Sequence, residues 1–421
     1  MSFSKCGVLL AVVCLARIAS PVMAIDGTPI WFSSFVASPG ANSYVSSPVL
    51  AFDHYGSASI GWTEINQNTS DGAVRHSQMT GLGLWNTRTL ITGNDVGKRA
   101  ALSFDRSERP LLAWINGDGS VQGQFNYGAN QSIAGTGAAN AARPNISLTY
   151  DLAGTARGYF GGTTTGNFRS IGHTGSAFTT ADMLSLSGVT LVHDSAMSTD
   201  GQGRRHFIAR GNLAGGGQGV LIASEPAGGG AWSTATLTSD DAIGGVDIAR
   251  DPTDGRMALA YTTLNSGTNT SKLFYAKFTG SFLQTTEVLS STTEQYRDVA
   301  LAFDLSDGRP AIAYENFVNS NSAQRLLMAY LTGAMTWQHS LVDDSILHDA
   351  PNNHARRPSL AFDDYGTSWP AIAYIDSNGA LTVAFDPPAP EPATAVLLLL
   401  GGLGIAAARR KKTGDRPLWI N

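Results

Sequence analysis

The chain has 421 residues, of which 43% are hydrophobic, 14% are charged and 47 are glycines. This composition is typical of one large turn-rich β domain or two smaller ones, and it disfavours a helical protein. The formal net charge is −5. Two terminal segments, described below, carry seven basic and two acidic residues, so the remainder has 21 basic and 31 acidic side chains. Such an acidic domain argues against nucleic acid as a partner.

The first 24 residues predict a secretory signal peptide. Lys5 precedes an apolar run over residues 7–16, and Val22 and Ala24 occupy the small-residue positions of a cleavage site. Both cysteines of the chain lie in this segment. We therefore expect the exported chain to contain no disulfide, no thiol nucleophile and no Cys-ligated metal.

One short phrase recurs between residues 25 and 388. Its clearest copies are ALSFDRSERPLLAW from Ala101, ALAFDLSDGRPAIAY from Ala300 and SLAFDDYGTSWPAIAY from Ser359. Each copy is an apolar strand that ends in Phe-Asp or a close variant, a turn, and a second apolar strand that ends in an aromatic residue. The Asp returns about every 52 residues, a period typical of propellers or arrays. We place it at Asp53, Asp105, Asp151, Asp194, Asp251, Asp304 and Asp363.

Two further strands follow in each period, such as LFYAKFTG from Leu273 and WSTATLTS from Trp232. Four antiparallel strands in 40 to 50 residues form the blade of a β-propeller. The last copy lacks its Trp strand, whereas a lone IWFSSFV from Ile30 precedes the first copy. The sequence therefore predicts an all-β protein, a seven-bladed β-propeller of four-stranded blades closed by the N-terminal strand. Six or eight blades remain alternatives because the fourth copy is weak.

The repeated residues have structural interpretations. The Asp opens a turn, where its carboxylate can accept backbone N–H groups two residues further on. One aromatic position is expected to fill the space between neighbouring blades. Its members are Trp62, Trp114, Tyr159, Tyr261, Tyr314 and Tyr374.

Arginines gather at one expected end of the channel. They lie six to eight residues ahead of the repeated Asp, at Arg99, Arg143, Arg297 and Arg357, the last preceded by Arg356. Because arginine forks bind carboxylate or sulfate groups, an acidic exopolysaccharide is a possible ligand. The alternative is that these arginines pair at the rim with nearby acids, namely Asp298, Asp343, Asp344 and Asp349.

Catalytic and metal signals are weak. Glu64 and Asp376 follow their aromatics by two residues in blades that become neighbours on ring closure, and a glycosidase needs two carboxylates. Hairpin turns explain the Asp376 segment equally well. The histidines show no metal-ligand spacing and no nucleotide or hydrolase motif is present, so the sequence predicts no metal and no cofactor.

The C-terminal segment has three parts. Pro390, Glu391 and Pro392 come first, an uncharged run over residues 393–408 follows, and four basic residues end it, namely Arg409, Arg410, Lys411 and Lys412. The run is short for a transmembrane helix, which needs about 20 residues, but basic residues at its end can snorkel. We expect the basic cluster and the tail 413–421 on the cytoplasmic side.

Residues 389–412 resemble the PEP-CTERM sorting signal of Gram-negative bacterial surface proteins, with all three parts in the same order. The resemblance implies processing by an exosortase, a membrane transpeptidase that cuts near Pro-Glu-Pro. It also implies an inner-membrane anchor before processing, and then a place on the cell surface of an exopolysaccharide-producing bacterium. The alternative is an ordinary C-terminal anchor.

These observations predict a surface protein that acts as a non-catalytic binding or scaffold module of the cell envelope or exopolysaccharide matrix. Two alternatives remain open. The first is an enzyme that acts on polysaccharide, either a glycosidase or a lyase. The second is a purely structural surface protein.

Overall fold

The chain is described from a computed structural model, which places residues 31–386 apart from 82, 142–143, 151–153, 164–165, 227–229, 239–243, 280–282, 319–322, 334–335, 348–356 and 364–367. The described residues belong to one compact unit. Within the described residues no helix is long and apolar enough to cross a membrane. The helix predicted at residues 393–408 lies outside them.

The first three blades are four-stranded antiparallel sheets with the strands in sequence order. The first contains β2 (Ser43–Phe52), β3 (Ala58–Asn66), β4 (Asp71–Gly81) and β5 (Leu84–Asn94). The second contains β6 (Arg99–Phe104), β7 (Pro110–Ile115), β8 (Val121–Phe125) and β9 (Gln131–Ala134). The third contains β10 (Ile146–Tyr150), β11 (Ala156–Gly161), β12 (Asn167–His173) and β13 (Phe178–Ser185).

The next three blades repeat this order. The fourth contains β14 (Val189–Thr199), β15 (Arg205–Leu213), β16 (Gln218–Ser224) and β17 (Ser233–Thr238). The fifth contains β18 (Val246–Arg250), β19 (Met257–Asn265), β20 (Thr270–Phe278) and β21 (Leu283–Ser291). The sixth contains β22 (Glu294–Phe303), β23 (Pro310–Val318), β24 (Ala323–Gly333) and β25 (Thr336–Asp343).

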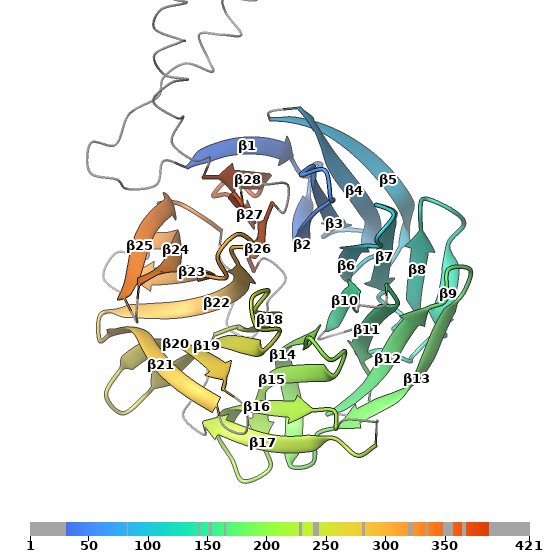
Figure 1. Ribbon diagram of the computed structural model, residues 1–421. Helices are drawn as coiled ribbons and strands as arrows, with labels where there is room; N and C mark the ends of the chain where they lie inside the picture. Colours follow the sequence, from blue (N-terminus) through green and yellow to red (C-terminus); the bar gives the residue numbers. More distant parts are fainter. Residues whose placement is uncertain are drawn as a thin grey trace, which may run out of the picture. The chain divides into compact units, whose positions relative to one another are not determined.

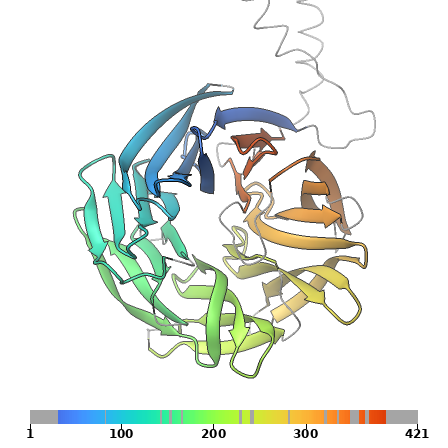
Figure 2. The ribbon, with the colours of Figure 1, turned by 180° about the vertical axis from the view of Figure 1, so that it is seen from behind.

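The seventh blade joins the two ends of the ring. It contains β26 (Ser359–Phe362), β27 (Pro370–Ile375), β28 (Leu381–Phe385) and, outermost, β1 (Phe32–Ala37). In Figure 1 the blue β1 lies along the red β28, and Phe32 pairs with Phe385. Closure pairs the outer edge of β28, which an open array would expose. The seven-bladed propeller closed by the N-terminal strand is thus confirmed, and the view from behind shows the same ring (Figure 2).

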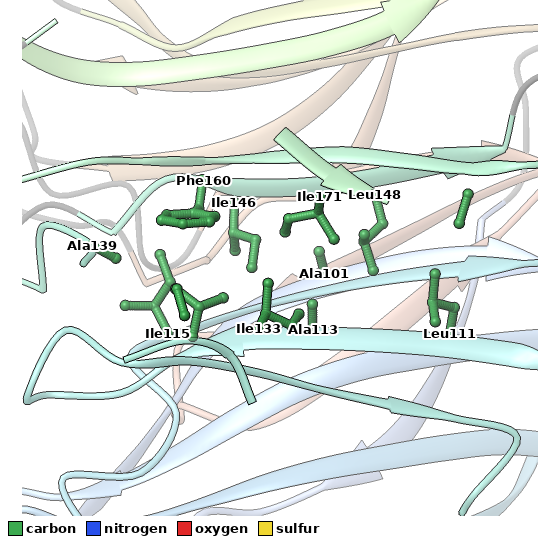
Figure 3. Packing of buried hydrophobic residues seen from close by; sticks show 13 residues of the cluster. Ala101, Leu111, Ala113, Ile115, Ile133, Ala139, Ile146, Leu148, Phe160 and Ile171 are labelled. Carbon is green, nitrogen blue, oxygen red and sulfur yellow. The ribbon is translucent and has the colours of Figure 1, made fainter. Parts of the chain in front are cut away.

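The core is divided among the blade interfaces. In the part of the chain that the structure describes, buried apolar side chains form seven clusters, and each cluster joins two neighbouring blades. Figure 3 shows the cluster between the second and third blades, where Ile115 of β7 lies opposite Ile146 and Phe160 of the third blade. Second strands such as β7 are buried along their whole length because both faces of the blade are covered. Their sequences are therefore continuously apolar.

The repeated aromatics fill these interfaces, as the sequence predicts, with one correction. Trp62, Trp114 and Tyr314 are at most 1% exposed. In the third blade, however, Phe160 and not Tyr159 lies at this place, because Phe160 pairs with Ile146 as Trp114 pairs with Ala100. Tyr159 instead packs in the next interface. There the fourth blade has only Ala209 at the aromatic position, and both residues belong to one cluster.

The turn role of the Asp is confirmed at four of the predicted positions and corrected in the fourth blade, and the predicted Asp151 lies outside the described residues. Asp53, Asp105, Asp251 and Asp304 each accept the N–H two residues further on, at 2.7–3.0 Å. In the fourth blade Asp200 makes this contact, with Gln202 at 2.9 Å. The repeat pattern in the sequence predicts Asp194 at that place, but Asp194 lies six residues earlier, on β14. A long turn and the absence of Phe-Asp caused the wrong alignment.

Candidate functional site

The central channel contains a cavity of about 370 Å³. All seven innermost strands contribute residues to its lining. Figure 1 shows these strands around the centre of the ring: β2, β6, β10, β14, β18, β22 and β26. Four residues before the turn Asp, each strand places one lining residue. These residues are Val49, Ala101, Ser147, Ala196, Asp247, Ala300 and Ser359. Six of them are small, so space remains in the bore, and Asp247 is the charged exception.

An ion-pair network lies at the end where the innermost strands begin. Arg357 Nη1 contacts both carboxylate oxygens of Asp194, at 3.0 and 3.1 Å. Arg99 Nη2 lies 3.6 Å from the same carboxylate. Arg99, Asp194 and Arg357 each stand six residues before the turn Asp of their blade, and Asp298 holds the same place in the sixth blade. The repeat thus brings equivalent positions of different blades together.

Asp194 is the centre of this network. Its carboxylate is fully buried and also accepts the N–H of Val246 at 3.1 Å. Burial works against the charge of Arg357, but attraction from Asp194 and Asp247 prevails and raises the pKa of this guanidinium. Burial lowers the pKa of Arg99, and repulsion from Arg357 adds to that effect. Removing either charge of a buried ion pair would destabilise the protein, because the other charge would stay buried without a partner.

Asp247 is the carboxylate that faces the cavity. One oxygen accepts the N–H of Leu301 at 2.7 Å, and the other lies 3.9 Å from Arg357 Nη2. Burial raises the pKa of Asp247, although Arg357 and the backbone bonds oppose this shift. The cavity therefore combines a guanidinium with a carboxyl group whose ionisation is weakened.

A third arginine lines the cavity near the opposite end. Arg250 is the last residue of β18, next to the turn, and its side chain is half-buried. Among the described residues it makes no side-chain hydrogen bond or ion pair. Most other blades carry Phe or Tyr at this place, as in Phe104 and Phe303.

The structure brings two of the four predicted arginines to the cavity. Arg99 and Arg357 line it, whereas Arg143 lies outside the described residues. Arg297 stays on its own blade, where it donates to Gln295 at 2.9 Å and its guanidinium lies 4.8 Å from the centre of the Phe317 ring. Of the expected rim acids, Asp298 attracts Arg99, Arg297 and Arg357. Asp343 instead accepts the hydroxyl of Tyr374 at 2.8 Å, and Asp349 lies outside the described residues.

The two carboxylates considered for glycoside hydrolysis, Glu64 and Asp376, bind other groups of the protein. Glu64 forms an ion pair with Arg75 at 2.8 Å and accepts the N–H of Gly40 at 2.7 Å. Asp376 accepts the N–H groups of Asn378 and Ala380 in a hairpin turn. Neither contributes to the lining of the channel cavity, so the pair is not arranged for glycoside cleavage there.

The fourth blade also holds a serine, a histidine and an aspartate in one chain of hydrogen bonds. His206 lies 2.9 Å from the Ser224 hydroxyl and 3.1 Å from Asp200. Asp200 is shared with Arg204, and the imidazole packs on Phe278 with 8% exposure. These contacts fit a structural link between the fourth and fifth blades. In the described part of the chain, no group of three or more potential ligands is placed to hold a metal ion.

The sequence did not identify Asp194, Asp247 and Arg250 as site residues. For Asp194 and Arg250, however, the sequence contained a pattern that could have identified them. Aligning the fourth copy on Asp200 would have put Asp194 at the same offset as Arg99 and Arg357. The loss of Phe before Asp251 marked Arg250.

Fold and tail together define the class: a seven-bladed β-propeller with a C-terminal sorting motif. The profile described as "PEP-CTERM protein-sorting motif" matches residues 388–412, which implies that the protein is exported, anchored by its C-terminus and processed by an exosortase. No curated protein matches the chain.

The chain resembles solved structures, including the following two. An ulvan lyase, described as a new family of polysaccharide lyase, is 11% identical with a TM-score of 0.53, covering 84% of this chain and 95% of its own. A protein of unknown function from Dyadobacter fermentans is 11% identical with a TM-score of 0.51, covering 84% and 96%. At this identity the likeness concerns the fold alone.

Proposed function

We propose that this protein is an exported surface module whose propeller binds an acidic polysaccharide in its channel without converting it. Residues 1–24 would be the signal peptide, 25–388 the binding domain, 389–412 the sorting signal and 413–421 a cytoplasmic tail. We place the processed protein on the surface of a Gram-negative bacterium that makes exopolysaccharide, which is the setting that such a tail implies.

The observation that carries this proposal is the charge that faces the cavity. Among the described residues, three that line the cavity are cationic, Arg99, Arg250 and Arg357, and one, Asp247, is a carboxylate. Burial raises the pKa of Asp247 and so weakens its negative charge. The other nearby carboxylates, Asp194 and Asp298, are at most 2% exposed and do not line the cavity. A ligand would therefore meet a positive surface although the domain is acidic.

Arginine suits this ligand class for a geometric reason. Its planar guanidinium donates two parallel hydrogen bonds to a carboxylate or sulfate. Arg357 uses mainly Nη1 for Asp194, and Nη2 is only loosely engaged by Asp247 at 3.9 Å. The small side chains along the bore leave room for a sugar unit, because a cavity of about 370 Å³ is within the roughly 300–1,000 Å³ of small-ligand sites.

The test uses the full-length protein in mild detergent, with polygalacturonate as the probe and neutral dextran as the control. Sizing chromatography should move the protein to the position of polygalacturonate and not of dextran. Arg250→Gln should weaken binding by about tenfold or more, since a hydrogen bond to a charged group contributes roughly 1.5–3 kcal/mol. Arg256→Gln, in the same hairpin but exposed, is the matched control. Equal binding of both polymers, or none, would contradict the proposal.

A lyase is the second candidate, and Asp247 is the observation that favours it. A carboxyl group with a raised pKa suits general acid–base chemistry, and Arg357 beside it could neutralise a uronate carboxylate. The same mixture distinguishes the two functions. Shortening of polygalacturonate with a rise in ultraviolet absorbance from unsaturated ends would establish the lyase and reject the non-catalytic module.

A further inference from the structure

We infer that the channel binds the end of an acidic polysaccharide chain and not an internal segment. This inference rests on the proposed function and adds which part of the polymer is recognised. Its basis is the cavity, which the ion-pair network crosses at one end and whose innermost strands are more exposed toward the other.

The network closes the bore because it crosses the axis. Asp194 belongs to the fourth blade and Arg357 to the position before β26 of the seventh, and their side chains are 3.0 Å apart. In a ring of seven these blades lie on opposite sides, so a direct contact between them must pass across the channel. Arg99 reaches the same carboxylate from the second blade. Further contacts hold this barrier in place, because Arg357 also lies 3.4 Å from the carbonyl of Val246.

The opposite end is more accessible. Of the seven described positions six residues before the turn Asp, six are buried and the one at Arg357 is half-buried. Two residues before the turn Asp all seven residues are half-buried, and Thr149, Ser198 and Ala249 among them line the cavity. Solvent therefore enters from the face that carries the Asp turns, and the ligand is expected to follow the same route.

A one-ended bore selects a chain end. An internal sugar unit has a neighbour on each side and needs two exits, whereas a terminal unit needs one. The terminal carboxylate can then reach Arg99 and Arg357 at the closed end. Arg250 lies five residues further along its strand than the position equivalent to Arg99, roughly 16 Å at the usual rise. It is therefore placed for the acidic group of a later unit.

The experiment compares two polygalacturonate fractions, one of long and one of short chains, at equal mass concentration. Calorimetric titration of the full-length protein gives the amount of protein bound per gram of polymer. End recognition predicts that this amount rises in inverse proportion to chain length. An equal amount per gram for both fractions overturns the inference while leaving the proposed function intact. The absence of binding to either fraction overturns both.

Two variants test the channel itself. Ser198→Phe and Thr149→Phe place a large side chain at half-buried lining positions of different blades and leave every lining arginine unchanged. Each should abolish binding to both fractions while the circular dichroism spectrum stays unchanged. Two positions are used so that a folding defect at one leaves the other informative. Full binding by a folded variant would place the ligand outside the bore and overturn the inference.

Discussion

Neutralising Asp194 tests the charge balance at the closed end of the channel. Asp194→Asn keeps the size of the side chain and an oxygen that can accept the N–H of Val246. It removes the negative charge that Arg357 contacts at 3.0 and 3.1 Å and that Arg99 approaches at 3.6 Å. Asp194 is fully buried, so water cannot replace the lost partner. Removing one member of a buried pair costs about 3–5 kcal/mol.

The expected result is a lower melting temperature. For a domain of this size each kcal/mol corresponds to about 1.3 °C, so the variant should melt about 4–7 °C below the wild type. Thermal unfolding followed by circular dichroism at neutral pH measures this. Asp182→Asn is the control, because Asp182 forms an exposed pair with Arg169 at 3.4 Å, and its melting temperature should not change. A melting temperature of Asp194→Asn within error of the wild type would refute a charge-balanced barrier.

Three further predictions concern the core, pH and sorting. Trp114→Ala should destabilise the protein by about 3–5 kcal/mol in urea unfolding, because Trp114 is fully buried between the first two blades; a loss below 1 kcal/mol would contradict this packing. Burial and nearby Arg88 lower the pKa of His76 to about 4. Between pH 6.5 and 4 the unfolded chain therefore binds more protons, so stability should fall by about 3 kcal/mol as pH decreases through this window. His76→Gln should reduce the dependence of stability on pH in this window. An unchanged pH dependence in this variant would mean that another group causes it. Glu391→Ala should block processing, so that the longer precursor accumulates on an immunoblot, whereas Glu108→Ala should be processed normally; processed Glu391→Ala would argue for an ordinary anchor.

The fold could be predicted because its information is local and repeated. Each blade needs an apolar strand, an Asp turn and a second apolar strand, and these patterns occur within about 16 residues, as from Ala300 to Tyr314. Ring closure was also predictable, because the spare strand at one end matched the missing strand at the other. Errors arose where the local pattern is ambiguous. Tyr159 and Phe160 are both aromatic and adjacent, and only strand pairing decides which of them faces the preceding blade.

The site was harder to predict because its contacts cross the ring. Arg99 and Arg357 could be expected near the channel from their place in the repeat. Their shared partner, Asp194, is 163 residues before Arg357, and the sequence analysis had assigned it to a turn. Arg297 shows the opposite error, a predicted site residue that does not reach the cavity. It fits the same sequence pattern, yet its guanidinium packs on Phe317 of the neighbouring strand. No sequence spacing distinguishes these two outcomes, since both depend on side-chain packing.

The departures from the repeat argue that the channel has a role beyond folding. At the lining position four residues before the turn Asp, six blades carry Val, Ala or Ser, and a channel lined in this way is sufficient for the ring to close. The fifth blade has Asp247 there and Arg250 three residues later, where most other blades carry Phe or Tyr. Partial burial of charged groups costs free energy that a small or aromatic residue would not require. Natural sequences break local rules chiefly at functional sites. Both departures from the repeat on this one strand line the same cavity, so a ligand that contacts both residues accounts for them more directly than the stability of the propeller does.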